Sequence, residues 1–314
     1  GGMGVGVSAH RLAGSVAALG GVGTISSVDL RRHHPDLMER TRALEGRGVD
    51  TAASKAAIDA ANVEALGREV KAARELARGL GLLAMNVMRA VGEYVAQVRA
   101  SLEAGIDAVV VGAGLPLDLP DLAADHPDTL LVPILSDSRG VALVVKKWER
   151  KKRLPDAIVI EHPRLAGGHL GAAKIADIGD TRFDFERVLP EVREFLNKAG
   201  IEREVPLIAA GGVRRFEDIA RLQSLGAAAV QLGTPFAVTS EGDAHPEFKR
   251  VLAQARDDDM VEFTSVAGLP ARAVLTPWLK GYLKLEPKLQ TVARVRERCT
   301  KAFDCLAQCG LRDG

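Results

Sequence analysis

The sequence predicts an α/β protein: a (β/α)8 barrel, or TIM barrel, whose first strand is missing from the sequence and which carries a C-terminal helical extension. Three observations lead to this fold. Short runs of Val, Ile, Leu and Ala recur along the chain, and they are continuously apolar, as expected of parallel strands covered on both faces. Each run is followed by a helical pattern. The 32 glycines and the many alanines suit helices that approach such a sheet closely.

The apolar runs predict seven strands, at residues 21–26, 82–87, 108–113, 130–136, 157–162, 206–212 and 229–234. Helical periodicity is clearest over 54–78, where Val63, Leu66 and Val70 recur three or four residues apart. Further helices are predicted over 8–19, 91–104, 138–153, 183–199 and 216–225. A strand before Gly1 would complete eight β–α units, and an open doubly wound sheet is the alternative. We expect the barrel over residues 1–241 and the helical extension, without a clear strand, over 242–314.

Composition excludes several classes of protein. Basic and acidic residues nearly balance, 42 against 41, so nucleic acid is not an expected partner. Hydrophobic residues make up 47% of the chain, which excludes disorder, and aromatic residues only 4%, which disfavours a β-sandwich or a single-strand binder. No apolar run approaches the roughly 18 residues of a membrane span, so no membrane partner is expected.

Three cysteines, Cys299, Cys305 and Cys309, stand near the C-terminal end and cannot form a disulfide framework. We therefore expect a reducing, cytoplasmic location. Their spacing would allow zinc or an iron–sulfur cluster with a fourth ligand from elsewhere, but buried or idle thiols are the favoured interpretation. No His-x3-His or Cys-x2-Cys spacing occurs, so no metal is predicted.

Two glycine-containing turns predict a phosphate site. Gly211-Gly212 follows the expected seventh barrel strand and Gly233-Thr234 the eighth, where barrels commonly bind phosphate through backbone N–H groups. Glycine lets the backbone approach phosphate oxygens that a Cβ would keep away. The competing interpretation is that these glycines serve only tight turns.

Another glycine pattern matches a dinucleotide-binding fingerprint. Gly4-x-Gly6-x-x-Ala9 is followed about 20 residues later by Asp29. The match is short and the chain is rich in glycine, so a Rossmann site is the less favoured alternative.

His169 is the histidine that best suits catalysis. It lies between Gly167-Gly168 and Gly171, after the sixth expected barrel strand, so its neighbours give it little steric cover. Imidazole has an unperturbed pKa near neutrality, which suits proton transfer. His162 is expected either to face the barrel mouth or to shape a loop, and His10 to begin a helix. The remaining histidines are expected to be solvated: His33, His34, His126 and His245.

Taken in order, these motifs resemble the nitronate monooxygenase family, also called 2-nitropropane dioxygenases. These are FMN enzymes that share a barrel with flavin-dependent enoyl-acyl-carrier-protein reductase II. The matching stretches span residues 1 to about 241 and are Gly1-Gly2-Met3-Gly4, Gly20-Gly21-Val22-Gly23, Asn86, Ala166-Gly167-Gly168-His169, Ala210-Gly211-Gly212-Val213 and Gly233-Thr234-Pro235-Phe236.

The resemblance implies that FMN binds at the C-terminal mouth of the barrel. The turns after the last two strands would hold its phosphate, the N-terminal segment would lie against the isoalloxazine, and Asn86 would hydrogen-bond to the flavin. His169 occupies the family's catalytic position. The cofactor-binding residues that the resemblance implies are Gly2, Met3, Asn86, Gly112, Ser136, Gly168, Gly211, Gly212, Gly233 and Thr234.

The resemblance also implies the reaction, oxidation of an alkyl nitronate with O2, in which the substrate reduces the flavin. His169 would stabilise the nitro oxygens when protonated, or remove the α-proton of a nitroalkane when neutral. The chain departs from the family at Leu165, where relatives often carry an acid, and at Pro235, where they often carry Arg. The first change removes one way of raising the pKa of His169, and the second leaves phosphate binding to backbone donors.

Two other functions stay open at this point. The same barrel could reduce an enoyl thioester or a quinone with NAD(P)H, although the sequence displays no nicotinamide or acyl-chain site. It could also be a non-catalytic subunit that binds flavin or phosphate. The expected partners are a small-molecule substrate, nitronate or nitroalkane, and O2. A homo-oligomer is compatible with the sequence.

Overall fold

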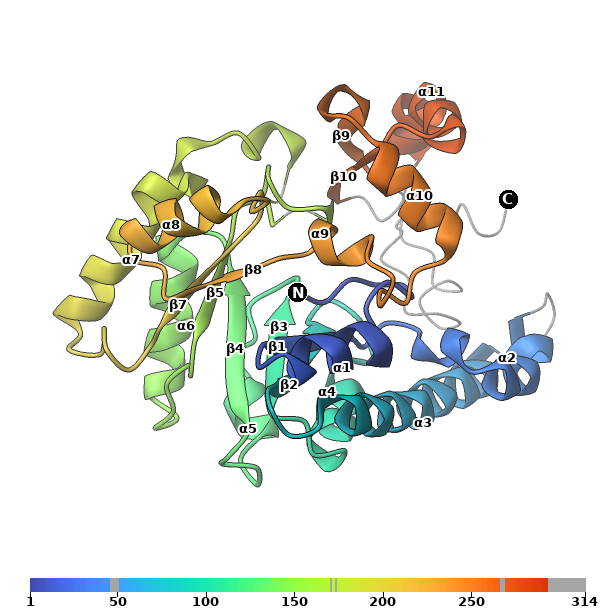
Figure 1. Cartoon of the computed structure of the whole chain (residues 1–314), viewed down its shortest axis with the longest axis horizontal. Coiled ribbons are helices and arrows are strands. Elements are labelled where there is room, and N and C mark those ends of the chain that lie inside the picture. The colour runs from blue at the N-terminus through green and yellow to red at the C-terminus, as the bar shows by residue number, and fades with distance from the viewer. Residues whose placement is uncertain (46–50, 170, 173, 266–268, 293–314) are drawn as a thin grey trace.

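Seven parallel strands form one curled sheet in the computed structural model, which describes residues 1–45, 51–169, 171–172, 174–265 and 269–292 (Figure 1). All seven fall where the sequence predicts them: β1 (Val22–Ser26), β2 (Leu82–Met88), β3 (Ala108–Gly112), β4 (Leu130–Leu135), β5 (Ile158–Glu161), β7 (Leu207–Ala210) and β8 (Ala229–Gln231). Their order across the sheet is their order in the chain. A doubly wound sheet requires a reversal of strand order, so the barrel class is confirmed.

β1 and β8 stand at the two ends of this row of strands. The first residues of the chain cross between them, because the amino group of Gly1 donates to Leu232 O at 2.8 Å and Ser26 N–H donates to Ser8 O at 3.0 Å. The strand expected before Gly1 lies outside the sequence and stays a prediction.

Helices cover the outside of the sheet (Figure 1). Six of them confirm predicted segments: α1 (His10–Ala18), α3 (Thr51–Ala77), α4 (Tyr94–Glu103), α6 (Ser138–Glu149), α7 (Phe185–Lys198) and α8 (Phe216–Ser224). Others were not predicted: α2 (Pro35–Arg42), α5 (Leu119–Leu122), α9 (Thr234–Ala237) and the 3-10 helices η1 (Leu30–His33), η2 (Ala43–Glu45), η3 (Ile175–Asp177), η4 (Thr181–Phe183) and η5 (Asp257–Asp259).

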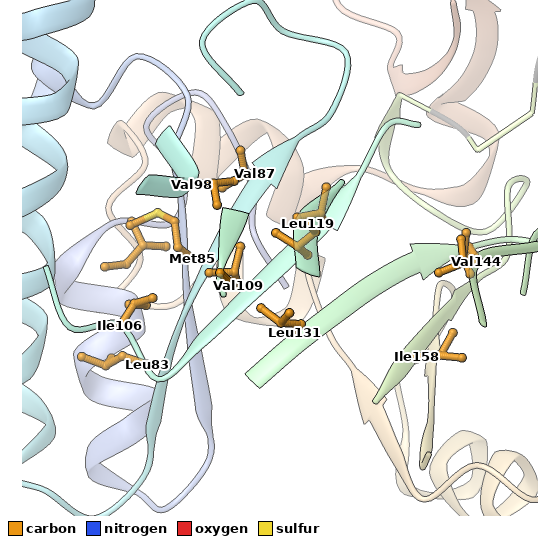
Figure 2. Packing of buried hydrophobic residues seen from close by; sticks show 14 of the residues in the cluster. Leu83, Met85, Val87, Val98, Ile106, Val109, Leu119, Leu131, Val144 and Ile158 are labelled. Atoms are coloured by element: carbon orange, nitrogen blue, oxygen red, sulfur yellow. The ribbon is translucent and has the colours of Figure 1, made fainter. Parts of the chain in front are cut away.

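The core has two layers because side chains alternate along each strand. One set fills the interior of the curled sheet, and its buried members include Ala84, Val110, Val132, Val159 and Ala210. The other set points to the helices. Figure 2 shows this outer layer, in which strand residues lie beside residues of the helical layer, among them Leu83, Met85, Val109, Leu131, Ile158, Val98 of α4 and Val144 of α6.

Small residues let α1 approach both α3 and the sheet. A Cβ on Gly14 of α1 would lie 2.6 Å from Leu76 Cβ of α3, and a Cβ on Gly23 of β1 would collide with Ala13 O of α1. The alanines that face this contact are fully buried, among them Ala13, Ala17, Ala65, Ala73 and Ala77. The close packing predicted from the alanine and glycine content is therefore confirmed.

The C-terminal region contains strands as well as helices, so the expectation of a strand-free extension was wrong. Between the helices α10 (Pro246–Gln254) and α11 (Pro277–Val292), β9 (Met260–Thr264) pairs antiparallel with β10 (Pro270–Val274). In β9 apolar Val261 and Phe263 alternate with polar residues, as expected of a strand with one solvated face. Barrel strands are recognised by continuous apolar runs instead, and that criterion does not find such a strand.

β6 (Gly168–His169) is the third strand of this small sheet, and two residues are too few to form a sequence pattern. The predicted boundary at residue 241 falls between α9 and α10 and stays a prediction. Cys299, Cys305 and Cys309 lie outside the described residues. Within the described part of the chain, no helix has the length and apolarity that crossing a membrane requires.

Candidate active site

The C-terminal ends of the strands gather the predicted site residues. Because the seven strands are parallel, these ends meet at one edge of the sheet. Asn86 lies in β2, Gly112 ends β3 and Ser136 directly follows β4. The turns at Gly211-Gly212 and Gly233-Thr234 follow β7 and β8. The structure therefore brings together residues that are spread from position 86 to position 234 of the sequence.

The N-terminal segment lies across this same edge. A Cβ on Gly2 would approach Asn86 Oδ1 to 2.7 Å, and a Cβ on Gly233 would lie 3.5 Å from Met3 Sδ. Met3 is held by Ser8, because Met3 N–H donates to Ser8 Oγ at 2.8 Å and Ser8 N–H donates to Met3 O at 3.0 Å. Gly2 and Met3 thus contact the ends of β2 and β8.

Asn86 is anchored to the neighbouring strand. Its Nδ2 donates to Val110 O of β3 at 3.2 Å, and it lies on the interior face of the sheet with Ala84. This bond fixes the amide at the barrel mouth, beside Gly2.

The turn at Gly211-Gly212 requires glycine, because its φ angles of 109° and 71° lie in a region that other residues rarely adopt. Leu165 packs against it, and a Cβ on Gly212 would lie 3.1 Å from Leu165 Cδ1. This turn therefore needs glycine for its backbone conformation, which is compatible with both interpretations of the glycines. Within the described part of the chain, the amides of Gly212, Gly233 and Thr234 donate to no loop or side-chain acceptor. These N–H groups could therefore donate to a phosphate, and the phosphate site stays a prediction.

The His169 loop folds back over the strand ends. Its two-residue strand β6 pairs with β10, with His169 opposite Ala271 and Gly168 opposite Arg272. Further along the loop, a Cβ on Gly171 would collide with Ser136 Oγ, so the chain lies on the end of β4. Leu165, earlier in the loop, touches the turn after β7. His169 thus belongs to the same end of the barrel as the glycine turns.

His162 shapes this loop. Its Nδ1 accepts the N–H of Arg164 at 3.2 Å, and its Nε2 lies 3.5 Å from Asp184 Oδ1. Its ring and that of Phe185 form a T-shaped pair with centroids 5.4 Å apart. Burial lowers the pKa of His162, although Asp184 acts in the opposite direction. Of the two interpretations offered by the sequence, these contacts favour the loop-shaping one.

Glu161 is a further candidate for the site, and it was not predicted from the sequence. It ends β5 on the same face as Val159, and therefore points into the barrel interior at the mouth. Burial raises its pKa to about 7, against an attraction to the Gly1 amino group that lowers it. A carboxyl group of this kind can accept or release a proton near neutral pH. The signal was present: a single acid ends an otherwise apolar run, AIVIE.

A second buried cluster lies beneath α1 and corrects the expectation for His34, whereas His10 begins α1 as predicted. Glu69 of α3 is fully buried; its Oε2 accepts the N–H of His10 at 2.8 Å and lies 2.8 Å from His10 Nδ1. His34 Nε2 lies 3.0 Å from Glu69 Oε1, so His34 packs against this buried carboxyl group and is not a solvated residue. Among the described residues, no group of three or more His, Cys, Asp or Glu is arranged to hold a metal ion.

Asp29 does not serve a dinucleotide. Its Oδ1 accepts from Arg31 Nε at 2.9 Å and its Oδ2 from Arg32, so both oxygens are bound within the turn that begins η1. Together with the sequential strand order, this removes the support for a Rossmann site.

Comparison with known proteins extends the sequence resemblance. A family model described as nitronate monooxygenase matches residues 1–310. A probable nitronate monooxygenase of Bacillus subtilis is 29% identical over 130 residues, which are 41% of this chain and 35% of the relative. A putative nitronate monooxygenase of Saccharomyces cerevisiae is 34% identical over 120 residues, which are 37% of this chain and 29% of the relative. The matched stretches span about a third of the length of these relatives.

Solved structures share the fold at low sequence identity. FabK from Thermotoga maritima superposes with a TM-score of 0.66 at 22% identity, over 92% of this chain and 75% of that chain. Nitroalkane oxidase from Streptomyces ansochromogenes gives a TM-score of 0.64 at 22% identity, over 91% of this chain and 78% of that chain. These likenesses support the barrel architecture.

Proposed function

Since the chain belongs to the nitronate monooxygenase family, we propose that it is an FMN-dependent oxidoreductase that oxidises alkyl nitronates with O2 and uses His169 as its catalytic acid or base. The family match over residues 1–310 carries this proposal. The meeting of the N-terminal segment, Asn86, the two glycine turns and the His169 loop at one end of the barrel supports it.

The residues at this end fit FMN. At Gly2 a side chain would collide with Asn86, and at the Gly211-Gly212 turn it would crowd Leu165 and strain the backbone, so glycine lets the main chain lie close to the strand ends. The amides of Gly212, Gly233 and Thr234 can donate to phosphate oxygens, as oriented backbone N–H groups do in other anion sites. Asn86, whose amide is anchored to Val110 O, would offer a hydrogen bond to the flavin. The residues proposed to hold FMN are Gly2, Met3, Asn86, Gly112, Ser136, Gly168, Gly211, Gly212, Gly233 and Thr234.

FMN, when bound, supplies the electron transfer and the reaction with oxygen. The protein's own task is to hold an anionic substrate and to control one proton. A protonated His169 would stabilise the negative oxygens of the nitronate, and a neutral His169 would accept the α-proton of a nitroalkane. Because the chain has a formal net charge of only +1, this anion must be met by local donors and not by a general positive field.

The deciding experiment follows the flavin spectrum. We expect the purified protein to show, or to gain on reconstitution, the visible absorption of bound FMN. Without oxygen, propionate-3-nitronate should bleach this absorption rapidly and NAD(P)H should not. The reverse pattern would favour the NAD(P)H-dependent reductase, bleaching by neither would favour a binding subunit, and failure to bind FMN would overturn the cofactor assignment.

A histidine pair tests the catalytic role. His169→Ala should abolish nitronate turnover and leave FMN bound, because the residue is assigned to proton control and not to cofactor binding. His126→Ala is the matched control, since among the described hydrogen bonds His126 contributes only its backbone. Full turnover in His169→Ala would show that another group performs the proton transfer.

A further inference from the structure

The strand that carries His169 is held by the C-terminal region and not by the parallel sheet. In the described structure, β6 has β10 as its strand partner, and β10 in turn pairs with β9 along five positions. The bonded partners of Gly168 and His169 are Arg272 and Ala271, about 100 residues later in the chain. The position of β6 therefore depends on where the β9–β10 pair lies.

Side chains reinforce this pairing at the start of the loop. Arg272 Nη1 donates to Arg164 O at 3.2 Å, and Glu262 Oε1 lies 3.6 Å from Arg164 Nε. Glu262 and Arg272 stand opposite each other in the β9–β10 register. Arg164 is thus bracketed by one residue from each strand, five positions before His169.

The β9–β10 pair is itself fixed at several points. Tyr282 Oη of α11 donates to Thr264 O at 2.6 Å, and Thr264 N–H donates to Glu286 Oε1 at 3.0 Å. Just before β9, Asp257 Oδ1 accepts from Arg214 Nη1 at 3.1 Å, which joins η5 to the loop after β7. These bonds make the pair a fixed support, tied both to α11 and to the barrel.

The loop needs such a support because its own sequence provides little stiffness. Gly167, Gly168 and Gly171 surround His169, and glycine loses more backbone entropy on ordering than any other residue. A catalytic imidazole must stay close to its productive geometry, and a displacement of about 1 Å can reduce the rate by about 100-fold. Two anchor points, at Arg164 and at Gly168–His169, restrict the segment that lies between them.

We propose that the β9–β10 pair positions the His169 strand for catalysis, and that Arg272 and Glu262 are positioning residues which act through Arg164. This inference rests on the proposed role of His169. It assigns a task to the C-terminal region, which lies outside the motifs that carry the family resemblance.

Limited proteolysis tests the support without reference to any activity. Trypsin cleavage after Arg164, whose side chain is exposed, should accelerate about tenfold in Arg272→Ala relative to cleavage after Arg203, an exposed residue in the turn before β7. Arg250→Ala is the matched control, because Arg250 lies in α10 and pairs with Glu247. An unchanged cleavage ratio in Arg272→Ala would overturn the proposal.

Kinetics then test the positioning. Arg272→Ala should lower kcat for the nitronate about tenfold and change KM less than about twofold, and Arg272→Lys should restore part of kcat. Faster cleavage with an unchanged kcat would refute the positioning role. Full turnover in His169→Ala alone would instead refute the proposed function, and the cleavage ratio would still report on the support.

Discussion

Glu161 offers a direct test of whether a negative charge buried at the barrel mouth destabilises the fold. It ends β5 on the interior face, and burial raises its pKa from 4.5 to about 7. The substitution Glu161→Gln keeps the size of the side chain and removes its ionisation. The folded variant therefore never has to hold a carboxylate in this position.

The expected magnitude follows from the pKa. A shift of about 2.5 pH units at about 1.4 kcal/mol per unit corresponds to about 3 kcal/mol. Because the pKa is raised, the folded state binds the proton more tightly than the unfolded state. The stability that this tighter proton binding by Glu161 contributes is fully present below about pH 4.5 and is lost as the pH rises through about 7. The wild type should lose about 3 kcal/mol relative to Glu161→Gln over that range.

Urea unfolding of both proteins from about pH 4.5 to about pH 8 measures this difference, since titrating groups that do not interact with Glu161 contribute equally to the two curves. Glu75→Gln, an exposed glutamate of α3, controls for the loss of one negative charge. A difference between wild type and Glu161→Gln that stays constant with pH would refute the reasoning. It would mean that the carboxylate at the mouth is stabilised by partners that offset its burial.

Two further predictions concern the N-terminal half of the fold. Glu69→Gln should lower the free energy of unfolding by about 2 kcal/mol at about pH 5.5 and by less at about pH 9, as measured by thermal unfolding. The hydrogen bond to Glu69 raises the pKa of His10, so the stability that His10 contributes is lost as the pH rises above that pKa. Burial tends to raise the pKa of Glu69, but the bonds from His10 lower it on balance. The stability that Glu69 contributes is therefore lost in acid. Asp243→Ala should cost about 1–2 kcal/mol, because Asp243 Oδ2 accepts the N–H groups of Ala9 at 2.8 Å and Leu12 at 3.1 Å; Asp243→Asn should recover part of this, and equal stability of Asp243→Ala and wild type would contradict the capping role.

The seven barrel strands and their helices were predictable because their signals are local. A strand buried on both faces is apolar along its whole length, and a covering helix repeats its apolar residues every three or four positions. β9 escaped prediction because Val261 and Phe263 alternate with polar residues. β6 escaped it because two residues carry no period.

The candidate site was predictable where a residue marks the end of a strand. Parallel strand order placed the two glycine turns at the barrel mouth, and the family resemblance named Asn86 and Ser136 there. Glu161 was missed, because its importance lies in the direction of its side chain and the burial around it. The role of His34 was missed for the same reason, since its partner Glu69 belongs to a different helix.

The sequence by itself determined the seven barrel strands, the six main helices that cover them, the close packing of small residues and the family to which the chain belongs. Only the tertiary structure decided how the His169 strand is held, which partner neutralises Glu69, and that Glu161 faces the interior. These features depend on contacts between segments that lie far apart in the chain. Pairing such as that of His169 with Ala271 leaves no periodic signal in either segment, because its stability arises only when the two meet.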